Sequence, residues 1–192
     1  MRDHIGSCIL GKIKCPIRCC PQMMSIEEVI VHLKDSHQLV VWSAEANGEV
    51  KHGKWMIVPT VMQNLIRGEE AYWNPVMATI GGQTFLLNCA AKDGSLFFWV
   101  TILGTVIESQ KYESTITLKS RKAHPTIISL TGKVYNIEMS VEDVLEDQYG
   151  VLEVSKSKAG KIGEIMENGN MPLYTNYRIT VSYASNTQLN VV

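Results

Sequence analysis

The sequence predicts a mainly β protein, an antiparallel β-sandwich preceded by a small cysteine- and histidine-rich head with one short helix. Four of the five cysteines lie within the first twenty residues. After residue 37 the chain becomes a series of short β-branched and aromatic runs separated by turn residues, as in sandwich proteins. With 192 residues, of which 45% are hydrophobic and 19% charged, the chain is long enough to bury one core beside a small appendage.

The part after residue 37 contains about ten runs with strand character. These are Leu39–Ala44, Gly53–Val61, Val76–Ile80, Thr84–Ala90, Leu96–Thr105, Glu113–Lys119, Thr126–Leu130, Lys133–Ile137, Gly150–Val154 and Asn176–Tyr183. Turn residues separate many of them, at Ala46-Asn47-Gly48, Gly81-Gly82, Lys92-Asp93-Gly94, Thr131-Gly132 and Asn168-Gly169-Asn170. Many short strands at this spacing predict antiparallel pairing.

Two segments interrupt the strand pattern and predict short helices, Ser25–Ser36 and Lys158–Glu167. Ser25 is followed three residues later by Glu28, the spacing of a capping box that satisfies the free amides of a first helical turn. Apolar residues then recur on one face of the first helix. They are Ile26, Val29, Ile30 and Leu33.

The head carries the spacing of a two-cysteine, two-histidine zinc site. Cys15 and Cys20 are separated by four residues, eleven residues follow, and His32 and His37 are again separated by four. Tetrahedral Zn²⁺ takes two thiolates from a tight loop and two imidazoles from a helix. A spacing of five exceeds one helical turn, so we expect the helix to loosen or end between the histidines. Cys19 is an alternative to Cys20, which we favour.

Four protein ligands leave no open coordination position, so the zinc is predicted to be structural. His4 and Cys8, upstream, resemble the second half of another zinc site whose first half is missing. They are interpreted as relic ligands or as ordinary surface residues. Cys89 lies in an apolar run and is predicted to be a buried core residue.

Composition disfavours several function classes. The formal net charge is −1, so the chain lacks the positive field of a general nucleic-acid binder. It has neither an apolar window long enough to span a membrane nor a recognisable signal peptide, and we expect a cytoplasmic protein that can also be nuclear. Sequence motifs of hydrolases, phosphate-binding loops, metalloproteases and dinucleotide-binding enzymes are missing. Cys89 and His124 could pair as nucleophile and base, but their spacing matches no known catalytic motif, and a core cysteine with a loop histidine is the simpler interpretation.

Head and body together resemble the seven-in-absentia family of RING-type ubiquitin ligases, over nearly the whole chain. The head match is His4-x3-Cys8-x6-Cys15 followed by Cys20-x11-His32-x4-His37, with SIEEVIVHLKDSH resembling the family's finger helix. The body match is Phe97-Phe98 leading into VTILGT, together with Glu167-Asn168-Gly169-Asn170 before the final strand. The chain departs from the family pattern in lacking the RING, in a shorter loop between Cys15 and Cys20, and in a weak match from Gln38 to Thr84.

The resemblance implies two units, a zinc-finger region at residues 1–37 with an incomplete leading finger and a TRAF-like substrate-binding domain at residues 38–186. The family's sandwich dimerises and binds degron peptides of the Pro-x-Ala-x-Val-x-Pro type by strand addition. Its peptide-contacting positions map approximately onto Val41, Ser43, Val76 and Met77.

By this resemblance the chain is expected to be a substrate-recognition protein of the ubiquitin–proteasome pathway. Its expected partners are degron-containing proteins and a second subunit, either another copy or a full-length relative, with only indirect access to the ubiquitin-conjugating enzyme. The alternative is a fragment of a RING-type ubiquitin ligase whose catalytic half is missing from this chain. In either case the chain alone is expected to have no ligase activity.

Overall fold

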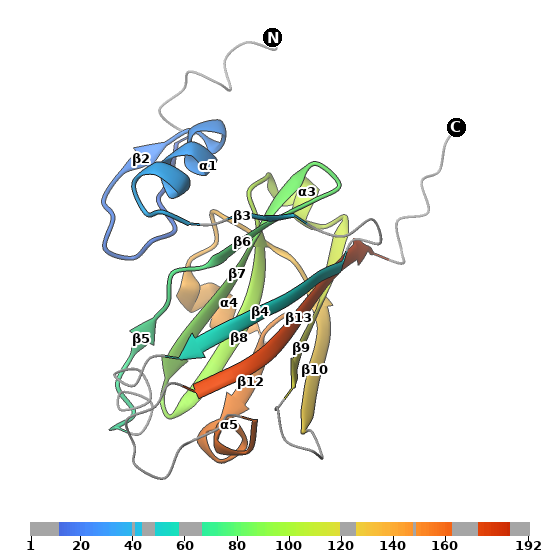
Figure 1. Ribbon diagram of the computed structural model, residues 1–192. Coiled ribbons are helices and arrows are strands. Elements are labelled where there is room, and N and C mark those ends of the chain that lie inside the picture. Colours follow the sequence, from blue (N-terminus) through green and yellow to red (C-terminus); the bar gives the residue numbers. More distant parts are fainter. Residues whose placement is uncertain are drawn as a thin grey trace.

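The structure is a computed structural model, and it describes residues 12–39, 41–43, 49–57, 67–119, 126–147, 149–162 and 173–184 (Figure 1). The predicted mainly β fold with a short helix in the head is confirmed. The described strands form two larger sheets and a small two-stranded ribbon in the head.

The larger sheet has seven strands and is mixed rather than purely antiparallel. Five of its strands follow the order β11 (Tyr135–Asn136), β8 (Ser95–Ile102), β7 (Gln83–Lys92), β6 (Val76–Ile80), β3 (Val41–Ser43). The other two strands are β12 (Leu152–Ser155), which pairs with β8, and β5 (Ala71–Tyr72), which pairs with β7. The pairs β3–β6 and β11–β8 are parallel, and the other pairs are antiparallel.

The second sheet has four strands, and all of its pairs are antiparallel. Its order is β10 (Ile127–Lys133), β9 (Tyr112–Lys119), β13 (Leu173–Tyr183), β4 (Glu49–Ile57). Side chains from both sheets share one core, in which Phe85 and Phe98 of the larger sheet belong with Ile116 and Ile179 of the smaller one. Each of these four side chains is at most 3% exposed, as expected for the interior of a sandwich.

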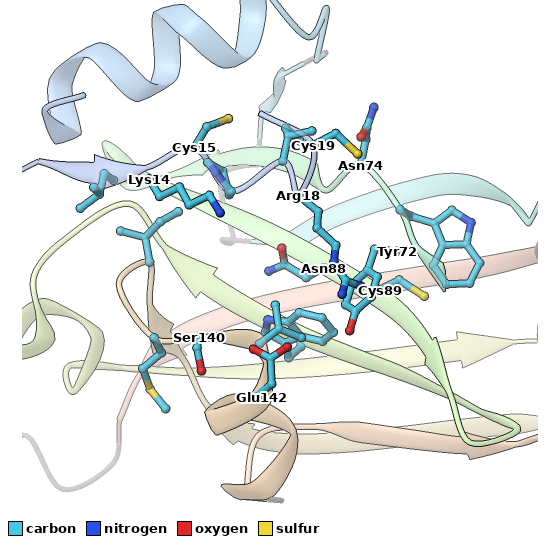
Figure 2. A pocket seen from close by; sticks show the side chains of 18 of the residues that line it. Lys14, Cys15, Arg18, Cys19, Tyr72, Asn74, Asn88, Cys89, Ser140 and Glu142 are labelled. Carbon is cyan, nitrogen blue, oxygen red and sulfur yellow. The ribbon is translucent and has the colours of Figure 1, made fainter. Parts of the chain in front are cut away.

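The outer face of the seven-stranded sheet is also covered, which explains why its strands are almost continuously apolar. The head covers one part of this face, where Met77 and Leu86 are fully buried. Helix α4 (Val141–Asp147) covers another part, where Trp99 packs in a cluster with Val144. A cavity remains on this face between the head and α4 (Figure 2).

Two of the predicted turns have the expected backbone. Gly81-Gly82 and Asp93-Gly94 join neighbouring antiparallel strands, and all four residues have positive φ, between 49° and 81°. Positive φ at both positions is the geometry of the two-residue hairpin turn. The turn predicted at Ala46-Asn47-Gly48 lies outside the described residues.

The turn predicted at Thr131-Gly132 is wrong, because β10 continues through both residues. Gly132 pairs with Ser114 in the antiparallel ladder with β9. A Cβ atom at Gly132 would overlap the carbonyl oxygen of Tyr149. The glycine therefore marks a close approach of another backbone segment and not a chain reversal.

Other segments differ from prediction at their ends. Strand β8 ends at Ile102, and Thr105 begins a second capped helix, α3 (Val106–Ser109), by accepting a hydrogen bond from the Glu108 N–H at 3.2 Å. Helix α5 (Lys156–Ile162) starts two residues before the predicted helix, whose end lies outside the described residues. The acidic segment Val141–Asp147 forms helix α4, which lies outside the two predicted helices.

Candidate metal centre

The two cysteines of the predicted site lie on the loop of a small hairpin in the head. Strand β1 (Ile13–Lys14) pairs with β2 (Met23–Met24), and the Cys15 N–H donates to the Gln22 carbonyl at 2.9 Å. Within the loop the Cys20 N–H donates to the Ile17 carbonyl at 2.9 Å. This turn brings Cys20 back toward Cys15, and both side chains are at most 9% exposed.

His32 lies in the last turns of helix α1 (Ile26–Asp35), and His37 follows just after the helix. The predicted capping box is present at its start, where the Glu28 carboxylate accepts the Ser25 N–H at 2.8 Å. The helix ends at Asp35, between the histidines, as the five-residue spacing predicts. Beyond it Gln38 has φ 53°, and the Leu39 N–H donates to the Leu33 carbonyl at 3.0 Å, which closes the chain around His37.

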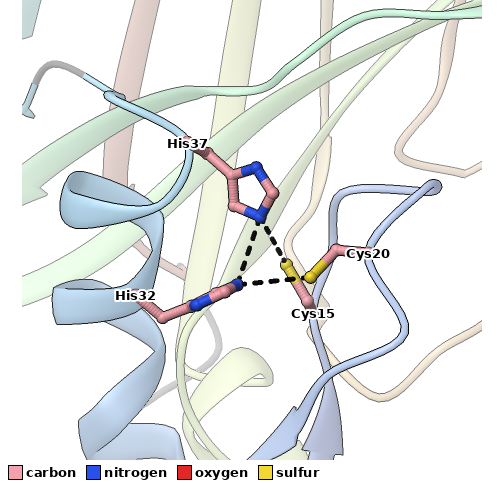
Figure 3. A group of neighbouring side chains, drawn as sticks. All are labelled: Cys15, Cys20, His32 and His37. Carbon is pink, nitrogen blue, oxygen red and sulfur yellow. Dashed lines mark hydrogen bonds between the residues drawn. The ribbon is translucent and has the colours of Figure 1, made fainter.

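The four predicted ligands converge on one point (Figure 3). Their ligand atoms all lie within 4.8 Å of one another. The Cys15 Sγ to His37 Nε2 distance is 3.5 Å, the Cys20 Sγ to His32 Nε2 distance is 3.4 Å, and the two Nε2 atoms are 3.1 Å apart. A tetrahedral ion with metal–sulfur bonds of about 2.3 Å and metal–nitrogen bonds of about 2.0–2.1 Å has sulfur–nitrogen edges of about 3.5 Å and nitrogen–nitrogen edges of about 3.3 Å. Three of the six edges of the group are close to these values, and the four side chains can hold a metal ion.

The protonation of Cys15 links metal binding to pH. Burial is the main cause that raises the pKa of the Cys15 thiol to about 11, and the Cys20 side chain adds to it while a backbone hydrogen bond from Ile17 opposes it. Without a metal ion the thiol is therefore protonated at neutral pH. A bound cation would displace this proton, because the thiolate is the ligand form.

Of the other cysteines and histidines singled out from the sequence, Cys19 and Cys89 lie among the described residues, and neither belongs to this group. Cys19 is exposed and does not belong to the four-residue cluster. His4 and Cys8 lie outside the described residues. Cys89 is 2% exposed in the core between the sheets, and burial raises the pKa of its thiol well above the usual range. Such a thiol has the character of an unreactive core residue.

The four predicted peptide-contacting residues lie on the neighbouring strands β3 and β6. Val41 pairs with Met77 in the parallel ladder, and Ser43 pairs with Thr79. The Met77 side chain is fully buried beneath the head, and Val76 packs against the core between the sheets. A peptide at this edge would therefore meet the β3 backbone and not the Met77 side chain.

One feature of the outer sheet face was missed at the sequence level. Asn88 interrupts the otherwise apolar run Thr84–Ala91, and it lies on the floor of the cavity between the head and α4. The sequence signal that could have revealed this site is a polar residue in the middle of a predicted strand whose neighbouring residues are apolar. Arg18 and Tyr72, which also line the cavity, are brought there from segments far apart in the chain.

No protein-family model matches the chain, and a search of curated proteins finds no match either. Among the described residues, no helix has the length and apolar character needed to cross a membrane.

Proposed function

We propose that this chain is a zinc-stabilised peptide-recognition protein that selects substrates for the ubiquitin–proteasome pathway. Two parts of the molecule support the proposal, the metal group in the head and the edge strand β3 that follows it. The link to ubiquitin comes from the sequence resemblance to the seven-in-absentia family.

Zinc is the metal whose preferences fit the head best. Two thiolates and two imidazoles in tetrahedral positions form a common structural zinc set, whereas Mg²⁺ and Ca²⁺ prefer oxygen ligands. All four positions are filled by protein side chains, which leaves no place for a substrate. The ion would supply folding free energy, because so small a head has little apolar surface of its own to bury.

The single observation that carries the peptide-binding role is the position of β3. It is the last strand on its side of the seven-stranded sheet, and no described strand pairs with its outer edge. An edge strand presents free N–H and C=O groups, to which an extended peptide can add as a further strand. Val41 of β3 also packs with the buried cluster of the head, so an intact head supports the edge.

The ligand we propose is a degron of the Pro-x-Ala-x-Val-x-Pro type, whose prolines limit pairing to the central residues. In this role the chain would recruit substrates to a ubiquitin ligase and act together with a second subunit. The second subunit would be another copy of this chain or a relative that carries substrates to the ligase.

Binding is tested with a fluorescein-labelled peptide of this type and the zinc-loaded chain, measured by fluorescence polarisation against a scrambled peptide. Two N-methylated versions test strand addition, one methylated at the Ala and Val positions and the other at the three x positions. In a strand, alternate N–H groups point to opposite sides, so only one version loses a hydrogen bond to the sheet. We expect at least a tenfold loss of affinity for one version and less than about twofold for the other.

Trp42 provides a reporter on the protein, because its side chain lies on β3 and is 41% exposed. We expect the peptide to change the intrinsic fluorescence of the wild-type chain and to leave that of Trp42→Phe unchanged, with similar affinity for both. Equal loss of affinity for both methylated peptides would contradict strand addition. No binding of the unmodified peptide by folded, zinc-loaded chain would contradict the proposed function.

A further inference from the structure

A cavity of about 830 Å³ lies on the outer face of the seven-stranded sheet, between the metal-binding loop and helix α4 (Figure 2). Its floor includes Asn88 and Trp99 of the sheet. One wall is the loop that carries Cys15, and the opposite wall is the segment Ile137–Glu142. The volume falls within the range of ligand sites. The cavity is distinct from the β3 edge, because β3 supplies no lining residue and is separated from β7 by β6.

Asn88 places a hydrogen-bond acceptor on the cavity floor. Its side-chain nitrogen donates to the Leu86 carbonyl and to the Thr101 hydroxyl, both at 3.1 Å. Because a carbonyl oxygen can only accept, the nitrogen of the amide is the atom that faces Leu86. The remaining amide oxygen has no partner among the described residues and is free to accept an N–H from a ligand.

The two walls carry opposite charge. Lys12, Lys14 and Arg18 stand on the side of the loop, and Glu138 and Glu142 stand on the side of α4. Figure 2 shows Lys14 extending toward the cavity from strand β1, next to the loop, and Glu142 extending toward it from α4.

Arg18 is engaged at one end of the cavity, where its guanidinium lies 3.9 Å from the centre of the Tyr72 ring and 3.4 Å from the Glu70 carboxylate. Burial is the main cause that raises the pKa of Tyr72. The Glu70 and Glu142 carboxylates raise it further, and the Arg18 guanidinium partly offsets the rise. The side chains of Lys14 and Glu142 have no ion pair in the described part of the chain, and both residues are exposed.

We propose that this cavity is a second peptide site, which takes an extended segment of a partner protein with an acidic side chain toward Lys14 and a basic side chain toward Glu142. Asn88 accepts one backbone N–H of the segment. Successive side chains of an extended peptide point to opposite sides. The acidic and basic residues of the ligand must therefore be separated by an odd number of positions.

This rule gives a test that needs no natural partner. Two pools of eight-residue peptides carry Glu at the third position and Lys at either the sixth or the fifth, with mixed Ala, Val, Thr and Leu elsewhere. Binding to the isotope-labelled, zinc-loaded chain is followed by amide chemical shifts. We expect the pool with odd spacing to shift the resonances of Lys14, Asn88 and Glu142 and to bind about fivefold more tightly than the pool with even spacing.

Charge reversal on the protein sharpens the test. Lys14→Glu and Glu142→Lys should each weaken binding of the odd-spaced pool about fivefold. The double variant should recover most of the affinity, because the same peptides can enter with their two faces exchanged. Lys34→Glu, an equal charge change on the exposed side of the head helix, is the matched control and should bind as the wild type does.

Equal binding of the two pools, or single variants that bind as well as the wild type, would overturn the proposal. The β3 edge is tested separately, because its degron affinity should be unchanged in Lys14→Glu, in Glu142→Lys and in the double variant. A chain that binds the odd-spaced peptides but not the degron would therefore contradict only the proposed function. A chain that binds the degron but shows no preference for the odd-spaced peptides would contradict only this second site.

Discussion

Replacing Leu33 with Ala should weaken zinc binding, although Leu33 is not a ligand. Leu33 lies on helix α1 next to His32, is fully buried, and belongs to the cluster that joins the head to Met77 and Leu86 of the sheet. If zinc supplies the free energy that folds the head, any loss of packing in the head must be offset by the same binding reaction. The lost packing energy then appears as a lower apparent zinc affinity.

The expected size follows from the burial of the side chain. Leu→Ala at a fully buried site costs about 2–5 kcal/mol, depending on how far the neighbours close the space. A loss of about 1.4 kcal/mol corresponds to a tenfold change in an equilibrium constant, so the low end of this range predicts a zinc affinity about thirtyfold weaker. Val31→Ala is the matched control, because Val31 lies on the same helix but is 58% exposed. Its effect should stay within about 0.5 kcal/mol, or roughly twofold.

The assay is a competition titration, in which a chromophoric chelator of known affinity reports free zinc as wild-type, Leu33→Ala or Val31→Ala chain is added. Circular dichroism of the metal-free proteins runs in parallel, to show whether the head helix is lost. A Leu33→Ala chain that binds zinc as tightly as the wild type would refute the coupling. It would mean that the head is folded before the metal arrives.

Three further outcomes follow from the site and the sandwich. Between pH 7 and pH 6 the apparent zinc affinity should fall at least tenfold in the same titration. The reason is that the Cys15 thiol, with a pKa of about 11, must release its proton to bind the metal. A zinc affinity independent of pH would contradict this. Cys20→Ser should abolish stoichiometric zinc binding measured by elemental analysis, while Cys19→Ser should leave it intact, and the reverse pattern would assign the ligand to Cys19. Gly132→Ala should destabilise the sandwich by about 1–3 kcal/mol in urea unfolding, because the added methyl would overlap the backbone of Tyr149. An unchanged unfolding midpoint would contradict this, because it would mean that the Tyr149 backbone moves aside without a loss of stability.

The head was largely predictable because its structure depends on residues close together in the chain. The capping box at Ser25 and Glu28 begins the helix, the spacing of His32 and His37 requires the helix to end between them, and both features are present. The choice between Cys19 and Cys20 was open at the sequence level. It depends on the backbone conformation of the loop, which includes the hydrogen bond from the Cys20 N–H to the Ile17 carbonyl and which no pattern of residue types specifies.

The body was predictable in class but not in its pairing. Apolar runs and positive-φ turns locate β6, β7 and β8, yet the parallel neighbours β3 and β11 come from strands far away along the chain. Gly132 looked like a turn residue because the same residue type serves both reversals and close backbone approaches. Only the fold brings Tyr149 against Gly132, and only the fold separates the head from α4 and leaves Asn88 uncovered.

X-ray absorption at the zinc edge of the metal-loaded chain tests the central claim most directly. The account predicts one zinc ion per chain, with two sulfur ligands at about 2.3 Å and two nitrogen ligands at about 2.0–2.1 Å, and no oxygen neighbour. His32→Ala should lose the metal or replace one nitrogen by a water oxygen. A wild-type spectrum with oxygen ligands, or with a single sulfur, would contradict the four-residue site formed by Cys15, Cys20, His32 and His37.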